Sequence, residues 1–144
     1  MSLMRRTHHA MLALAVISGF SASSMASANE ALWTLIPGTE TAPIFIDQSS
    51  IQPSPQNLAW RTATLLAQPF DNETPPRPVP NASATMEITV DCTLRAIRTD
   101  AMHQFNQAYA KGEVVKSMTM ENNDFQNAQT TAQGDTFIVN TVCK

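Results

Sequence analysis

The sequence predicts a single domain built mainly from β-strands. The chain has 144 residues, a usual size for one domain, and its 43 % hydrophobic and 15 % charged residues suit a globular protein. From Met86 to Ala96, apolar and polar side chains alternate strictly, which is typical of a half-buried antiparallel strand. The only cysteines, Cys92 and Cys143, are too few for a disulfide-dense miniprotein or a four-cysteine zinc site.

The first 28 residues have the pattern of a secretory signal peptide. Two arginines precede an apolar stretch from Met11 to Phe20, and a small-x-small cleavage site follows at Ala26-Ser27-Ala28. We expect cleavage between Ala28 and Asn29, so that residues 29–144 form the mature protein. The apolar stretch is shorter than the roughly 20 residues of a membrane-spanning helix. We therefore expect a periplasmic or secreted product with no transmembrane segment and, because no cysteine lies near the cut, no lipid anchor.

Charge and residue types argue against several classes of function. Cleavage removes two arginines and no acidic residue, so the net charge changes from -3 to -5, which gives no electrostatic reason to expect nucleic-acid binding. His103 is the one histidine that remains. With it alone we expect no catalytic Ser-His-Asp arrangement and no metal site, and the chain has no phosphate-binding loop or dinucleotide fingerprint. The sequence predicts a protein that is not an enzyme and carries no cofactor.

Export places both cysteines where disulfides form and persist. An intramolecular bridge between Cys92 and Cys143 is the simplest interpretation, since redox-active pairs usually lie close together in the sequence. The bridge would close a loop of about 51 residues and stabilise the fold by roughly 4 kcal/mol in the chain-entropy model. It would also hold the end of the chain, which otherwise tends to fray.

Further strands and one loop follow from local composition. We expect short strands over Leu32–Ile36 and over Ile44–Ile46, the second ending at Asp47, and a longer one over Leu58–Leu66. All nine prolines lie between Pro37 and Pro80. Their concentration predicts an exposed proline-rich loop over residues 69–84.

Two later segments stay ambiguous on local pattern. Residues 99–112 have helical spacing of apolar residues. Alternatively, Phe105–Tyr109 and Val114–Met120 could be the two arms of a hairpin that turns at Ala110-Lys111-Gly112. Residues 136–142 favour a strand by propensity, but Gly134 and Asp135 could begin a short helix with Asp135 as its N-cap.

The order of several short motifs resembles a known family. From Trp33 the chain continues with Phe45-Ile46-Asp47, Ile51, Trp60-Arg61, Asp91-Cys92, Arg95, Arg98, Tyr109, Gly112-Glu113-Val114-Val115, Ser117, Phe125, Gly134-Asp135 and Val142-Cys143. This order is similar to that of the surface-adhesin protein E-like domain of exported proteins in Gram-negative bacteria, and the similarity extends over nearly all of residues 31–144. Phe125 stands where the family usually has a tryptophan.

The resemblance implies an α+β, mainly β fold. It consists of a single antiparallel sheet of about six strands with a C-terminal helix that a disulfide ties to the sheet, and Cys92 and Cys143 match the family's two cysteines. It also implies a hairpin over 102–120 and a helix over roughly 133–143, against the local preferences. The member that names the family is an outer-membrane lipoprotein that binds host matrix and serum proteins, and this chain lacks its lipid-attachment cysteine.

These observations lead to one main functional hypothesis and two alternatives. We expect a non-enzymatic, adhesin-like binding protein that engages an envelope or host protein through its sheet face or loops. The candidate binding residues are four basic ones: Arg61, Arg95, Arg98 and Lys116. The alternatives are a periplasmic inhibitor of a hydrolase such as lysozyme, and a small-ligand carrier that binds haem through Met102, His103 and Tyr109.

Overall fold

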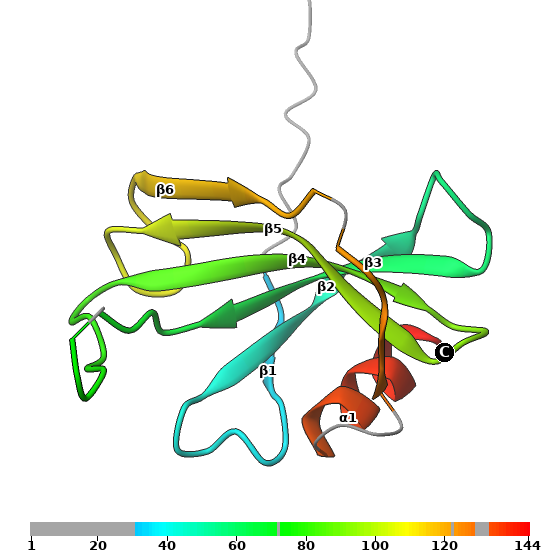
Figure 1. Ribbon diagram of the computed structural model, residues 1–144, viewed down its shortest axis with the longest axis horizontal. Helices are drawn as coiled ribbons and strands as arrows, with labels where there is room; N and C mark the ends of the chain where they lie inside the picture. Colours follow the sequence, from blue (N-terminus) through cyan, green and yellow to red (C-terminus); the bar gives the residue numbers. More distant parts are fainter. Residues whose placement is uncertain (1–30, 72, 122, 129–132) are drawn as a thin grey trace, which may run out of the picture.

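One antiparallel sheet with a helix against one of its faces makes up the structure, a computed structural model that describes residues 31–71, 73–121, 123–128 and 133–144 (Figure 1). The strands are β1 (Trp33–Leu35), β2 (Ile44–Pro53), β3 (Trp60–Ala67), β4 (Ser83–Asp91), β5 (Ala96–Phe105), β6 (Val114–Thr119) and β7 (Gln126–Asn127), and the helix is α1 (Gln133–Val142). The strands follow one another from β1 to β6 across the sheet, and β7 pairs with β5. The predicted fold class is confirmed.

The core lies between α1 and the central strands. Ile138, Val139 and Val142 of α1 are buried, and they pack against a cluster that includes Ile46, Leu65, Ile88 and Val90. Burial of each such side chain contributes roughly 1.5–3 kcal/mol, so this contact fixes α1 on its face of the sheet.

A disulfide between Cys92 and Cys143 joins α1 to the end of β4, with the two Cα atoms 5.5 Å apart. Cys92 directly follows Asp91, the last residue of β4, and Cys143 directly follows α1. The predicted bridge is therefore confirmed, and it closes the helix onto the sheet at the chain's C-terminal end.

The predicted strand over Met86–Ala96 is wrong in its second half. β4 ends at Asp91, whose Oδ1 accepts hydrogen bonds from the backbone N–H groups of Thr93 and Leu94. These bonds turn the chain, and Arg95 takes a φ of 53° before β5 begins at Ala96. The alternation of apolar and polar residues continues through this turn by chance, because the turn is stabilised by the aspartate and not by the hydrophobic pattern.

Two other predicted strand boundaries differ from the structure. β2 does not end at Asp47 but continues to Pro53, with an irregularity in its pairing between Asp47 and Gln52. The Asp47 carboxylate accepts bonds from the backbone N–H and the hydroxyl of Ser49, which stabilises this irregular part of the strand. β3 begins at Trp60, and Leu58 is 99 % exposed in the preceding turn.

The two ambiguous segments adopt the structures that the resemblance implies. β5 and β6 form a hairpin, and the helix preferred by the local pattern of residues 99–112 is absent from that segment. Residues 133–142 form α1, so the strand favoured by propensity is wrong there too. Asp135 lies inside the first turn of α1 rather than at its N-cap.

The proline-rich segment connects β3 to β4. It runs from residue 68 to residue 82, since Ser83 already belongs to β4. A bridge between Phe70 and Pro78 closes it, and the Asp71 N–H donates to the carbonyl of Arg77 at 2.9 Å. Residues 1–28, which carry the predicted signal peptide and its cleavage site, lie outside the described residues.

Candidate functional site

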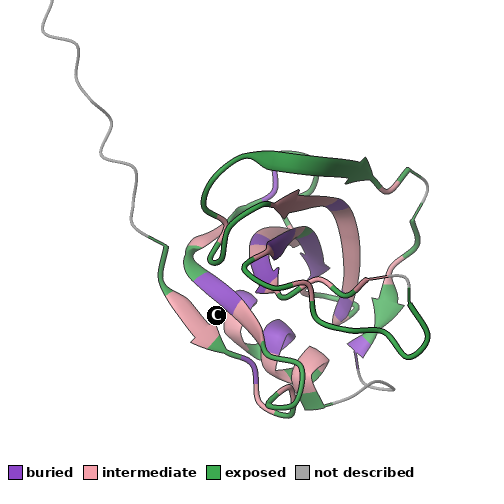
Figure 2. Ribbon diagram, turned by 90° about the vertical axis from the view of Figure 1, so that its left-hand side faces the viewer, coloured by how far each residue is buried: buried purple, intermediate pink, exposed green. Residues whose placement is uncertain are grey.

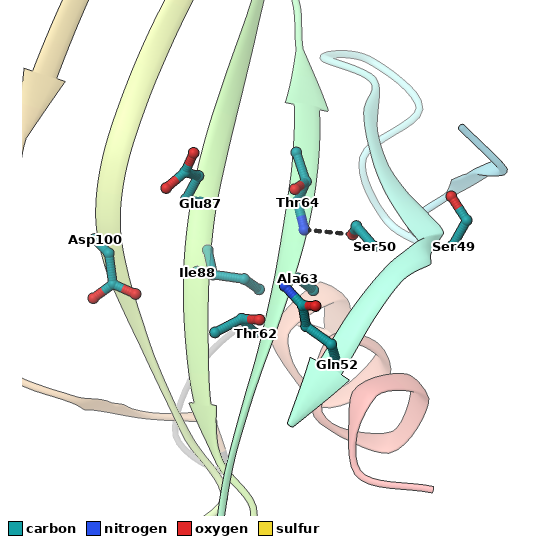
Figure 3. A pocket seen from close by; sticks show the side chains of 9 residues that line it. All are labelled: Ser49, Ser50, Gln52, Thr62, Ala63, Thr64, Glu87, Ile88 and Asp100. Carbon is teal, nitrogen blue, oxygen red and sulfur yellow. Dashed lines mark hydrogen bonds between the residues drawn. The ribbon is translucent and has the colours of Figure 1, made fainter. Parts of the chain in front are cut away.

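The two faces of the sheet differ in chemistry, and the face opposite α1 is polar. Cross-strand pairing places Thr62, Thr89 and Arg98 in one row on this face. A second row, in the same register, runs from Thr64 through Glu87 toward β5. Figure 3 views this polar face, with α1 behind the sheet. We call the surface formed by these rows the polar face.

Arg98 lies at the centre of a cluster on the polar face. Its guanidinium carbon is 5.2 Å from the ring centroid of Trp60 and 4.9 Å from that of Phe125. The two ring centroids are 5.0 Å apart, with the planes tilted by 57°. Cation–π contacts of this kind contribute about 0.5–2 kcal/mol, depending on how far the cation is removed from water. We call these three side chains the arginine cluster.

Carboxylates hold the arginine cluster in place. The Nε of Arg98 donates to Oδ1 of Asp100 at 2.7 Å, and the Thr89 hydroxyl donates to the other oxygen of the same carboxylate. The indole N–H of Trp60 donates to Oδ2 of Asp91 at 2.8 Å. Trp60 and Arg98 are thus oriented by hydrogen bonds to carboxylates in a network that extends over three strands.

Asp91 has a lowered pKa. Burial alone would raise the pKa of this carboxyl, but hydrogen bonds from the Leu94 N–H, the Trp60 indole and the Thr93 N–H favour the ionised form. The three bonds together outweigh the burial, so the pKa lies below its ordinary value. Asp91 is therefore an ionised acceptor at neutral pH and serves to orient its neighbours.

Two hollows lie beside one another on the polar face. One has a volume of about 370 Å³, and its lining consists mostly of hydroxyl, amide and carboxylate side chains: Ser49, Ser50, Gln52, Thr62, Ala63, Thr64, Glu87, Ile88 and Asp100 (Figure 3). The other, about 570 Å³, shares Thr62 and Asp100 with the first and is also lined by Arg98. Because they share Thr62 and Asp100, the two hollows are adjacent. We call them together the polar depression, and Arg98 of the arginine cluster lines one of them.

Thr62 lines both hollows, and its hydroxyl oxygen is buried with no hydrogen-bond partner among the described residues. By contrast, Thr89, its cross-strand neighbour, is fully bonded to Asp100. Buried polar atoms normally have hydrogen-bond partners, so the Thr62 hydroxyl is an exception on the polar face.

His103 also lies on the polar face, next to Ser117 and Glu87. Its Nδ1 is 3.0 Å from the Ser117 hydroxyl, and its Nε2 is 3.4 Å from a carboxylate oxygen of Glu87. Met102 faces the other side of the sheet, and Tyr109 is 62 % exposed in the β5–β6 turn. The three residues of the haem hypothesis are therefore not brought together. Within the described residues, no three His, Cys, Asp or Glu side chains are grouped as a metal site would need.

A family model of surface-adhesin protein E matches residues 33–144, which is most of the chain. The chain belongs to the surface-adhesin protein E family.

A solved structure of protein E has the same fold. The chain superposes on protein E from non-typeable Haemophilus influenzae with a TM-score of 0.53 and 11 % sequence identity, over 78 % of this chain and 79 % of that one. A selenomethionine form of Haemophilus influenzae protein E gives a TM-score of 0.46 at 10 % identity, covering 69 % of this chain and 78 % of that chain. No curated protein sequence matches the chain. At this identity the likeness extends to the fold alone.

The four basic residues predicted for binding do not form one patch in this adhesin-family domain. Arg98 is on the polar face, whereas register places Arg61 on the opposite face. Arg95 lies in the β4–β5 turn, where its guanidinium donates to Oδ1 of Asn140 on α1 at 2.7 Å. Lys116 lies on β6, beside Gln104 on the same face as α1. Of the four, Arg98 belongs to the candidate site.

Sequence reasoning missed the partners of Arg98. Trp60 and Thr62 share a face by simple alternation, and that signal was present in the sequence. Phe125 is 27 residues beyond Arg98 and has no periodic relation to it, so only the family order of motifs points to an aromatic there. The role of Asp100 depends on the irregular pairing of β4 with β5 near Glu87, which no sequence pattern indicated.

Proposed function

We propose that this chain is an exported, non-enzymatic binding protein of the cell envelope, and that it engages an envelope or host protein through the polar face. Membership of an adhesin family supports binding as its general role. In this proposal residues 1–28 direct export and are removed, and residues 29–144 act in the periplasm or outside the cell. No described helix is long and apolar enough to span a membrane.

The observation that carries the proposal is the arginine cluster beside the polar depression. Trp60, Arg98 and Phe125 are only partly buried, so each presents part of its surface to a partner. Arginine and aromatic residues are enriched where protein interfaces gain most of their energy. Because carboxylates already orient Trp60 and Arg98, these two side chains would lose little conformational freedom when a partner binds.

The depression supplies the polar part of such an interface. Its hydroxyl and carboxylate groups can hydrogen-bond to a partner's backbone or polar side chains. A protein contact that covers both the depression and the cluster would combine a stacked centre with a hydrogen-bonded rim, as specific interfaces do. Neither the inhibitor nor the haem-carrier alternative has such an observation in its favour.

The proposal is tested by capturing partners with purified protein. Tagged chain is incubated with envelope extracts and with host matrix and serum proteins, and saturable binders are quantified. Glu87→Lys reverses a charge at the edge of the depression, where the Glu87 side chain is 59 % exposed, so it should reduce capture without unfolding the domain. Glu73→Lys, in the loop between β3 and β4, is the matched control and should leave capture unchanged.

Absence of any saturable partner in these sets would overturn the proposal. So would equal capture by wild type and Glu87→Lys. The export step has its own check, because the mass of the protein recovered from the periplasm should correspond to a chain that begins at Asn29.

A further inference from the structure

The strand β6 forms the outer edge of the sheet and is exposed along its whole length (Figures 1 and 2). Within the described part of the chain it pairs with β5 alone. Val114, Val115 and Met118 are 51, 57 and 42 % exposed. An edge strand presents unpaired backbone N–H and C=O groups, and proteins usually protect such edges with charges, prolines or covering segments. β6 carries one charged residue, Lys116, and no proline.

An apolar groove leads inward from β6 on the face of the sheet that carries α1. Cross-strand pairing aligns Leu65, Met86, Met102 and Met118 in a row from the core to the edge. The three methionines supply flexible and polarisable side chains, which adapt to apolar groups of different shape. The three methionines of this row line one side of the groove.

Small residues form the floor of the groove. In the next row, Ala67 and Ala84 stand beside Gln104 and Lys116, so the sheet surface is low where the alanines lie. Phe70, which is 48 % exposed, forms a wall from the β3–β4 connection. The resulting groove has a volume of about 300 Å³, enough to receive an apolar side chain.

Lys116 lies at the outer end of this groove without a counter-charge. Among the described residues no carboxylate lies within ion-pair distance of its ammonium group. Lys116 and Met118 are two residues apart and lie on the same side of β6. A strand placed beside β6 would present alternate side chains to Met118 and Lys116. An apolar residue and an acidic residue two positions apart would match these two.

We propose that β6 and the adjoining groove form a strand-addition site for an extended polypeptide segment of a partner protein. The segment adds an eighth strand to the sheet, inserts an apolar side chain beside Met118 and Phe70, and places an acidic side chain opposite Lys116. In this mode, backbone hydrogen bonds supply affinity, and alternate side chains supply specificity. The inference rests on the proposed function for the class of partner, a polypeptide, but it concerns a different surface from the polar face.

The test is a titration of isotope-labelled, disulfide-bonded protein with a synthetic peptide, followed by NMR. The probe is acetyl-Thr-Leu-Thr-Glu-Thr-Val-Thr-amide, in which apolar and acidic residues alternate with threonine. The amide resonances of residues 114–119 should shift and saturate. The same peptide with proline in place of its two central threonines keeps the apolar and acidic groups but cannot pair as a strand, so it should not bind.

Protein variants test the two side-chain contacts. Met118→Thr should lower the affinity for the peptide by about two- to fivefold, as expected for loss of one cross-strand pair. Lys116→Glu should lower the affinity for the original peptide by a similar factor. A peptide with lysine in place of glutamate should then bind this variant with restored affinity. Leu58→Thr, at a fully exposed site on another turn, should have no effect. Thermal unfolding of each variant shows whether it remains folded.

Several outcomes would overturn the strand-addition site. These are an absence of shifts in β6, shifts confined to the polar face, or equal binding of the proline peptide. A concentration-dependent dimer that Met118→Thr abolishes would show that a second copy of the chain covers the edge instead. Capture of a partner that Glu87→Lys abolishes, without any effect of Met118→Thr, would uphold the proposed function and contradict this inference.

Discussion

The buried hydroxyl of Thr62 is the polar atom of the polar face whose replacement gives the clearest test. Its hydroxyl is buried without a partner, so replacement by valine, which has the same shape, removes a desolvated polar atom and no hydrogen bond. We expect Thr62→Val to leave the free energy of unfolding unchanged or to raise it by about 0.5–1 kcal/mol in urea denaturation.

Thr89→Val is the matched control for this measurement. The two threonines are cross-strand partners, but Thr89 is bonded to Asp100, so its replacement should lower the free energy of unfolding by about 1–3 kcal/mol. If Thr62→Val lowered the free energy of unfolding by more than about 1 kcal/mol, the Thr62 hydroxyl would have a hydrogen-bond partner, which would contradict this account.

Arg98 links the aromatic pair to Asp100. Replacing it by alanine removes two cation–π contacts and leaves the half-buried carboxylate of Asp100 without its guanidinium. We expect Arg98→Ala to lower the free energy of unfolding by about 2 kcal/mol. Arg95→Ala, which loses one exposed hydrogen bond to Asn140, should cost less than about 1 kcal/mol. If urea denaturation gave the same loss of unfolding free energy for both variants, the stabilising role of Arg98 in the cluster would be contradicted.

Asp91 makes stability depend on pH in acid. Because its pKa is lower in the folded than in the unfolded protein, its contribution is present at neutral pH and is lost as the pH falls through the folded-state pKa. Asp91→Asn should therefore be less stable than wild type at pH 7, and the difference should narrow below the ordinary pKa of 3.8. Urea denaturation at a series of pH values measures this, with Glu121→Gln as the exposed control. A difference that does not change with pH would count against the ionised Asp91.

At the scale of the elements, the turn between β5 and β6 depends on Gly112. The residue has a φ of 76°, and a Cβ at this position would clash with Oδ1 of Asn106. That same oxygen accepts the N–H of Glu113 at 2.9 Å, so displacing it would open the hairpin. We expect Gly112→Ala to lower the free energy of unfolding by about 1–3 kcal/mol and to broaden the NMR signals of β6. Lys111→Ala, in the same turn, should change little, and an equal loss in both would refute this account of the turn.

The sequence predicted strand faces better than strand ends. Alternation correctly placed Met86, Ile88 and Val90 on the buried face, because a half-buried strand must alternate wherever it lies. It could not show that the Asp91 carboxylate ends β4, since the turn depends on two hydrogen bonds to that carboxylate rather than on hydrophobicity. The β5–β6 hairpin and α1 required the family resemblance, because tertiary packing overrides the local preference in both.

At the scale of the whole molecule, one covalent link closes the fold. The Cys92–Cys143 bridge spans 51 residues, and the chain-entropy model gives it roughly 4 kcal/mol. We expect the double variant Cys92→Ser, Cys143→Ser to lose about that much stability and to match reduced wild type in urea denaturation. A loss below about 1 kcal/mol would show that packing of α1 alone holds the helix in place.

The candidate site was predictable only in part, because it is a property of the assembled sheet. Basic residues could be found in the sequence, but their faces could not, and only Arg98 lies in the arginine cluster. Lys116 stands instead at the edge groove, on the other face. Which basic side chain meets which aromatic or carboxylate depends on strand register, and register depends here on irregular pairings in β2 and β5.

In the proposed function, the polar face is the surface that contacts the partner. Hydrogen–deuterium exchange on the captured complex tests it most directly, by comparing bound with free protein. The account predicts slowed exchange in residues 49–52, 85–91 and 98–101, with α1 unchanged. Slowed exchange confined to α1 and the β1–β2 connection, with those three segments unchanged, would contradict it.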